Sequence, residues 1–159
     1  MSTIEAITLD NPVPFSTTLE VRDACLCLYV QRAARALARR FDTAFRPLGI
    51  TNGQFSLLMS LNRPHPAPMG PVAQLLAMDR TTLTAALKPL EKKGLLTITP
   101  DPSDRRSRLL SLTDEGRALL ARAAPIWRSE HAALESELPP DSPADAMRAG
   151  LMAIAFGNA

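Results

Sequence analysis

Residues 95–116 read LLTITPDPSDRRSRLLSLTDEG, and this stretch decides the fold. Two short runs of apolar and β-branched residues, 95–99 and 108–112, are typical of strands. The link between them, 100–107, is rich in proline, aspartate and serine, which favour turns. The pattern therefore predicts a β-hairpin, and Arg105, Arg106 and Arg108 lie at or near its tip.

The residues after the hairpin predict a long helix over 114–138. Thr113 is a suitable N-cap, and Asp114 and Glu115 place negative charge in the first turn, where the helix dipole favours it. Pro125 lies inside this helix and is expected to bend it or to interrupt its hydrogen bonding. Prolines at 139, 140 and 143 mark a break before a short last helix over 142–156.

The residues before the hairpin predict four helices. An amphipathic stripe over 20–46 predicts a first long helix, and Thr51 with Gln54 has the form of a capping box that begins a second at 54–61. A short third helix begins at Gly70-Pro71, and Asp79 caps a fourth over 80–93. The proline-rich residues 64–68 are expected to form an extended connection. The fold class is therefore mainly α with a small β-hairpin.

The helix over 80–93 has two different faces. Leu83, Leu87 and Leu90 share one side and are expected to be buried, because successive residues turn by about 100°. The opposite side carries Thr81 and Ala85, then Lys88 and Lys92, with Thr84 at its edge. Small side chains followed by cations suit a helix that enters the major groove of DNA. An ordinary solvated face fits this helix equally well when it is taken alone.

The hairpin favours the DNA interpretation. Arginine suits the narrow minor groove, where the potential is most negative, and Asp104 is close enough to hold a guanidinium in position. The net charge of +2 is unevenly distributed, since residues 1–79 carry +1, residues 80–108 carry +4 and residues 109–159 carry −3. A basic centre is therefore hidden by an acidic C-terminal part.

The hairpin and the residues that flank it resemble the MarR family of bacterial transcription regulators. The run 95–116 is similar to that family's wing, and Leu90-Glu91, Gly94-Leu95 and 48–51 with Gln54 fit the pattern of its preceding helices. The resemblance covers about residues 22–136. It implies a winged helix-turn-helix with N- and C-terminal dimerisation helices, and a homodimer that binds a near-palindromic operator in double-stranded DNA.

The resemblance also implies roles for single residues. Residues 80–88 would form the recognition helix, Arg106 would enter the minor groove, and Asp104 would position it. The expected DNA-binding residues are Arg80, Thr81, Thr82, Thr84, Lys88, Asp104, Arg105, Arg106 and Arg108. The expected organisation is an N-terminal arm at 1–16, a dimerisation helix at 17–50, a DNA-binding region at 51–112 and dimerisation helices at 113–159.

In this family the effector is commonly a small aromatic or phenolic molecule, so the resemblance implies a regulator, most simply a repressor, that such a molecule releases from DNA. Arg32, Arg35 and Arg39 have two interpretations, since they either line the effector site or are solvated and paired between helices. Trp127 is expected to pack between helices. No cofactor and no metal site are expected, because His65 and His131 lack partners at ligand spacing.

Cys25 and Cys27 leave an alternative open. Cys25 matches the position of the reactive cysteine in the thiol-sensing branch of the family, which gives a regulator that responds to oxidants. The tyrosines that assist that cysteine are replaced here by Phe45 and Asn52. The two cysteines are two residues apart on the expected helix over 20–46, so they point about 200° apart and cannot bridge. The other interpretation is that both are small buried apolar side chains.

The composition excludes several classes of protein. Hydrophobic content of 46% rules out wholesale disorder, and no run is long enough to span a membrane. No secretory signal opens the chain, so a cytoplasmic location is expected. The sequence shows no Ser-His-carboxylate set and no glycine-rich phosphate loop, which argues against an enzyme. A winged helix that binds only protein is a further alternative, but it would not need these cations.

Overall fold

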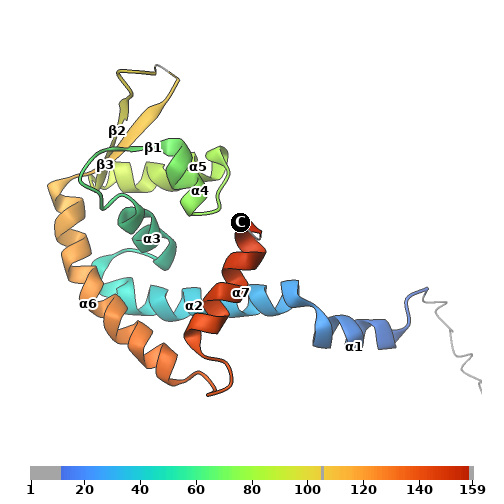
Figure 1. Cartoon of the computed structure of the whole chain (residues 1–159). Helices are drawn as coiled ribbons and strands as arrows, with labels where there is room; N and C mark the ends of the chain where they lie inside the picture. Colours follow the sequence, from blue (N-terminus) through green and yellow to red (C-terminus); the bar gives the residue numbers. More distant parts are fainter. Residues whose placement is uncertain (1–11, 105, 158–159) are drawn as a thin grey trace, which may run out of the picture. The chain divides into compact units, whose positions relative to one another are not determined.

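The computed structural model describes residues 12–104 and 106–157. The described part is mostly helical, with one small sheet (Figure 1). In chain order the elements are α1 (Phe15–Ala24), α2 (Leu26–Phe45), the 3-10 turn η1 (Arg46–Leu48), α3 (Asn52–Ser60), β1 (Ala67–Pro68), α4 (Met69–Leu75), α5 (Arg80–Lys92), β2 (Leu96–Pro100), β3 (Arg108–Leu112), α6 (Asp114–Ser136) and α7 (Ala144–Phe156).

The chain forms two compact units, Met1–Leu37 and Ala38–Ala159, and the boundary falls within α2. The expectation of a single helix over 20–46 is wrong. Cys25 has extended backbone angles (φ −75°, ψ 101°) and separates α1 from α2. The expected N-terminal arm is shorter than 1–16, because Phe15 and Ser16 belong to α1; residues 1–11 lie outside the described part.

The described residues of the first unit contain no buried side chain. Phe15, Val21, Leu26 and Tyr29 are each more than half exposed. Side chains of this kind are normally covered in a folded protein, because burying each contributes about 1.5–3 kcal/mol. This unit therefore carries apolar surface that its own fold does not bury.

The second unit contains the hydrophobic core. Phe45, at the end of α2, is fully buried, and its ring stacks on Phe55 of α3 with 4.6 Å between centroids. Thr51 and Gln54 form the predicted capping box at the start of α3, with the Thr51 hydroxyl accepting from the Gln54 amide at 3.2 Å. Leucines of α3, α5 and the sheet complete the core.

A three-stranded antiparallel sheet with strand order β1-β3-β2 forms the wing. The β2–β3 hairpin is the predicted one, with Leu96 opposite Leu112 and Pro100 opposite Arg108. The strand β1 was not predicted, since residues 64–68 were expected only to connect two helices. Buried Ala67 pairs with Leu110 of β3, and β1 lies at the sheet edge, where proline is tolerated.

The helix α6 begins directly against the base of the hairpin. A Cβ on Gly116 would lie 2.0 Å from the carbonyl oxygen of Leu95, so no other residue fits there without movement. Pro125 does not interrupt α6, which continues to Ser136. The last helix, α7, has no buried residue, and Leu151, Met152, Ile154 and Phe156 are exposed.

Candidate nucleic-acid interface

The helices α4 and α5 are joined by a tight turn over 76–79. Ala77 adopts a left-handed conformation (φ 50°), which is unusual for a residue with a side chain. The amide of Met78 donates to the Ala73 carbonyl at 2.9 Å, which fixes the chain reversal. A short helix, a tight turn and a longer helix form a helix-turn-helix.

The α5 faces are those that the sequence predicts. Leu83, Leu87 and Leu90 are fully buried. Thr81, Ala85, Lys88 and Lys92 are exposed, as are Arg80, Thr82 and Thr84. Pro89 lies within α5 and the helix nevertheless continues to Lys92.

The N-terminus of α5 is held by Asp79. Its carboxylate accepts from the Thr82 amide at 2.8 Å and from the Thr82 hydroxyl at 2.7 Å. These hydrogen bonds lower the pKa of Asp79, and the one from the Thr82 backbone amide contributes most. The Thr84 hydroxyl donates to the Arg80 carbonyl at 2.7 Å. Thr81 is exposed and forms no side-chain hydrogen bond within the described part of the chain, so its hydroxyl is available to a base edge.

The wing tip is ordered by two aspartates. Asp101 accepts hydrogen bonds from the amide of Ser103 at 2.8 Å and from its hydroxyl at 2.6 Å. Both bonds lower the pKa of Asp101, and the one from the hydroxyl contributes most. Asp104 accepts from the backbone amide of Arg106 at 2.9 Å. Asp104 therefore contacts the backbone of Arg106 and not its guanidinium. Arg105 lies outside the described residues.

Residues 51–112, which we call the head, include α3, α4, α5 and the wing, and the β2–β3 hairpin extends away from these helices (Figure 1). Arg106 and Arg108 are exposed. Pairing of Pro100 with Arg108 and of Thr99 with Leu109 carries the hairpin up to its tip. The exposed face of α5 and the wing tip thus present cations from two separate elements of one head.

Thr113 fixes the base of the wing to the residues that follow α5. Its hydroxyl donates to the Gly94 carbonyl at 2.6 Å and accepts from the Gly116 amide at 3.0 Å. Its own amide donates to the Leu95 carbonyl at 3.2 Å. One residue therefore joins α5, the hairpin and α6, and the sequence indicated only its role as the N-cap of α6.

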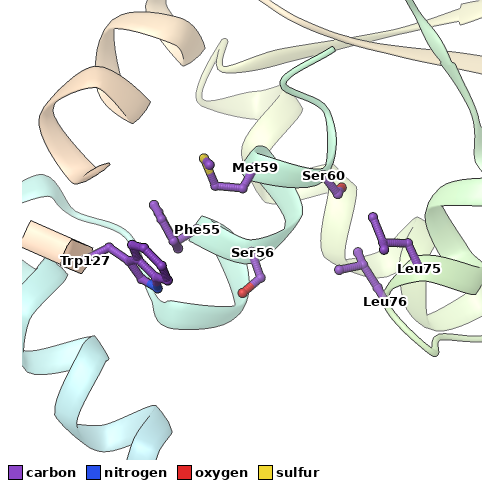
Figure 2. Close-up of a pocket in the computed structure, with 7 residues that line it drawn as sticks. All are labelled: Phe55, Ser56, Met59, Ser60, Leu75, Leu76 and Trp127. Atoms are coloured by element: carbon purple, nitrogen blue, oxygen red, sulfur yellow. The ribbon is translucent and has the colours of Figure 1, made fainter. Parts of the chain in front are cut away.

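A pocket of about 380 Å³ lies beside the head, between α3, the end of α4 and α6. Phe55 and Trp127 lie close together at one end of the pocket, and Leu75 and Leu76 face it from the other side (Figure 2). Ser56 and Ser60 add hydroxyls, and Met59 completes the lining. Trp127 is 38% exposed, so the expectation that it only packs between helices is incomplete. Sequence spacing gave no signal for this pocket, because its residues come from three separate helices.

The arginines of α2 do not line this pocket. Arg35 donates to Gln31 at 3.3 Å on the same helix, while Arg32 and Arg39 are exposed. Arg40 pairs with Glu130 of α6 at 3.1 Å and with Glu137, the C-cap residue of α6, at 2.7 Å. These pairs raise the pKa of Arg40, with the larger contribution from Glu137, and the bond to Arg40 lowers the pKa of Glu137. Of the two interpretations of Arg32, Arg35 and Arg39, exposure of all three fits the solvated one, and the interhelical ion pairs belong to Arg40 instead.

The cysteines are free thiols that are not fully buried. Cys25 is half-buried and lies outside both helices, so the argument that the pair shares one helix does not hold. Cys27 is exposed, and its sulfur accepts from the Gln31 side chain at 3.6 Å. The interpretation of both as buried apolar side chains is wrong, because Cys25 is only half-buried and Cys27 is exposed.

Comparisons with known proteins agree with this geometry. The MarR family model matches residues 50–107. The organic hydroperoxide resistance transcriptional regulator of Bacillus subtilis is 31% identical over 101 residues, which cover 64% of this chain and 69% of that protein. No helix in the described part is long and apolar enough to cross a membrane.

Two solved structures share the fold closely. The transcriptional regulator MosR of M. tuberculosis, in complex with DNA, is 32% identical with a TM-score of 0.75, over 82% of this chain and 93% of that one. CouR from Rhodococcus jostii RHA1, bound to p-coumaroyl-CoA, is 26% identical with a TM-score of 0.72, over 86% of this chain and 96% of that one.

Proposed function

This chain belongs to the MarR family of transcription regulators, and we propose that it acts as a homodimeric repressor on a near-palindromic operator. The observation that carries the proposal is the pair of basic surfaces on one head, the outer face of α5 and the wing tip. Thr113 and Gly116 hold these two surfaces in a fixed relation. The related MosR structure contains DNA, which supports the same use of this fold.

In this proposal α5 enters the major groove and the wing enters the neighbouring minor groove. Thr81 reaches base edges, Arg80 and Lys88 meet phosphates, and Thr82 and Thr84 contact DNA through their methyl groups, since their hydroxyls already donate within the protein. Arg106 enters the minor groove, flanked by Arg105 and Arg108. Asp104 acts by fixing the backbone at Arg106.

The proposed dimer buries apolar surface that one protomer leaves exposed. The first unit exposes Phe15, Val21, Leu26 and Tyr29, and α7 exposes Ile154 and its neighbours. Large apolar side chains left exposed in this number favour a protein interface on each of these two segments. We assign residues 17–50 and 113–159 to dimerisation and residues 51–112 to DNA binding. A second copy of the chain then supplies the second head that a palindromic operator needs.

The pocket beside the head is the proposed effector site. Its volume of about 380 Å³ suits a small molecule with one aromatic ring, and its lining is mostly apolar. Phe55 and Trp127 offer faces for an aromatic ring, while Ser56 is positioned for a phenolic hydroxyl. That the related CouR structure holds p-coumaroyl-CoA supports an effector of aromatic character.

The effector acts in this scheme by favouring one spacing of the two recognition helices. A ligand shifts such an equilibrium only if it binds one arrangement more tightly than the other. The free dimer matches two half-sites one DNA turn apart, about 34–36 Å, and represses by occupying the operator. The effector-bound dimer does not match that spacing. Since the operator is chromosomal DNA, the proposed location is the cytoplasm.

Selection of bound sequences from a random DNA pool tests the operator proposal. The expected result is an inverted repeat whose half-sites are centred about 10–10.5 base pairs apart, bound by two chains. Recovery of no common sequence, or of a single asymmetric site bound by one chain, would contradict it.

Tryptophan fluorescence tests the effector site, because Trp127 is the only tryptophan in the chain. Titration with a small phenolic acid is expected to change its emission in a saturable way and to weaken operator binding. The variant Ser56→Ala should bind the same compound more weakly, and Ser136→Ala, near the end of α6, should not. Saturation with unchanged operator affinity would contradict the proposed regulation.

A further inference from the structure

A second, much smaller pocket lies at the base of the wing. It has a volume of about 130 Å³ and is enclosed by the loop after α3, the end of β3 and the first turns of α6. Arg63, His65, Ser111 and Arg117 line it, together with Pro64 and Pro66. The residues come from three segments that are far apart in the sequence, so the pocket exists only in the folded head.

The two arginines of this pocket are oriented by the backbone. The Nε of Arg63 donates to the Ser60 carbonyl at 2.9 Å, which is the last residue of α3. An Nη2 hydrogen of Arg117 points at the Leu112 carbonyl at 3.5 Å, at the end of β3. Each guanidinium therefore uses one N–H within the protein and keeps its other N–H groups for a ligand.

These arginines also lack a neutralising carboxylate. No ion pair joins Arg63 or Arg117 to an acidic side chain within the described residues, whereas Arg40 and Arg148 in the same unit are both paired. The lining of the pocket contains no aspartate or glutamate. Two like charges that line one small pocket repel each other, and a bound anion reduces that repulsion.

We propose that this pocket binds a small dissolved oxoanion of the phosphate class. A planar guanidinium presents paired donors that match phosphate oxygens, and the lining contains two of them, on Arg63 and Arg117. His65 and Ser111 also line the pocket, and their side chains carry further hydrogen-bond donors for an anion. The small volume excludes an aromatic effector, so this site is separate from the pocket that contains Trp127.

The position of the pocket distinguishes its ligand from a DNA phosphate. The strand β3 runs from Arg108 at the wing tip to Leu112 at the pocket. Five extended residues span roughly 13 Å, so the pocket lies at the far end of the hairpin from the residues proposed to enter the minor groove. A bound anion would join the loop at 61–66 to the junction of β3 and α6, next to Thr113.

Titration of the full chain with inorganic phosphate, followed by amide ¹H–¹⁵N NMR, tests this site. Saturable shifts are expected at His65, Ser111 and Arg117. The variants Arg63→Gln and Arg117→Gln should each weaken phosphate binding by about tenfold, since each removes a charged hydrogen-bonding partner. The matched control Arg122→Gln, also exposed on α6, should bind phosphate as the unmodified chain does.

Two further titrations separate the possible sources of the anion. Acetate shows whether a carboxylate replaces phosphate, and weaker binding than that of phosphate is expected. A DNA duplex should shift resonances of α5 and the wing tip but not those of the pocket. The proposal is overturned if phosphate shifts do not saturate, if they centre on α5, or if Arg122→Gln loses as much affinity as Arg117→Gln.

Discussion

At the scale of single residues, Gly116 has the least freedom to change. A Cβ at this position would meet the Leu95 carbonyl oxygen at 2.0 Å, and that atom belongs to the backbone. We expect Gly116→Ala to lower the free energy of unfolding by about 1–3 kcal/mol, because α6 must move away from the base of the wing. Chemical denaturation measures this change.

The control for Gly116 is another helical glycine. A Cβ on Gly53 of α3 would find its nearest neighbour, the Thr51 hydroxyl, at 4.0 Å. Gly53→Ala should therefore leave stability unchanged or raise it, because alanine favours a helix. Equal stability of Gly116→Ala and the unmodified chain would contradict the close packing described for Leu95.

Some site residues could be assigned from the sequence alone and others could not. Thr81 and Lys88 follow from helical spacing, which depends only on neighbours within α5. The hydrogen bond that the Arg106 amide donates to the Asp104 carboxylate could not be predicted, because two side chains of opposite charge suggest an ion pair first. Trp127 entered the candidate site only once α3, α4 and α6 were placed together.

At the scale of elements, Thr113 connects the start of α6 to the residues that link α5 with the hairpin. Thr113→Ala should lower stability by about 1 kcal/mol or more, since it removes the N-cap of α6 and the bond to the Gly94 carbonyl. Thr113→Ser keeps a hydroxyl and should retain most of the stability. The two variants are compared by their denaturation midpoints, and identical losses would show that the hydroxyl is not the cause.

The cap of α5 depends on pH through Asp79. Its pKa is lowered in the folded chain by bonds from Thr82, so its contribution to stability is complete above the ordinary aspartate pKa of about 3.9. The contribution is lost as pH falls through the lowered value. We therefore expect the Thr82 amide resonance to keep its capped position at pH 4 and to shift below it.

Asp79→Asn provides the comparison for this pH dependence, because asparagine also caps helices but does not titrate in this range. The Thr82 resonance of that variant should not move between pH 5 and pH 3. A resonance that titrates equally in both proteins would contradict the assignment of the effect to Asp79.

Elements with local signals were predicted and elements with distant partners were not. Caps at Thr51, Asp79 and Thr113 lie within three residues of the groups that they bind, so sequence spacing reveals them. The strand β1 depends on pairing of Ala67 with Leu110, more than 40 residues away. The break at Cys25 contains neither proline nor glycine, and it was missed for that reason.

At the scale of the whole molecule, charge is concentrated where DNA is proposed to bind. The net charge of +2 hides +4 over residues 80–108, most of it on α5 and the wing. Operator affinity should therefore fall steeply as salt concentration rises. Lys88→Gln should reduce the slope of log affinity against log salt by roughly 2 for a dimer, because one phosphate contact is lost in each protomer.

The same substitution also shows whether Lys88 contacts DNA phosphates or reads the base sequence. Lys88→Gln should weaken binding to operator and to unrelated DNA by similar factors, because phosphates carry no sequence information. Filter binding at several salt concentrations measures both. An unchanged salt slope would show that Lys88 belongs to a solvated helix face.

The most direct test of the account is the operator affinity of Arg106→Ala beside that of Arg128→Ala. Arg128 is an exposed arginine on α6, so both variants lose the same charge from an exposed position. Loss of a wing arginine from the minor groove should weaken specific binding roughly 10- to 100-fold, while Arg128→Ala binds normally and both chains remain folded dimers. Operator affinity that is equal in the two variants would contradict the assignment of the wing to DNA.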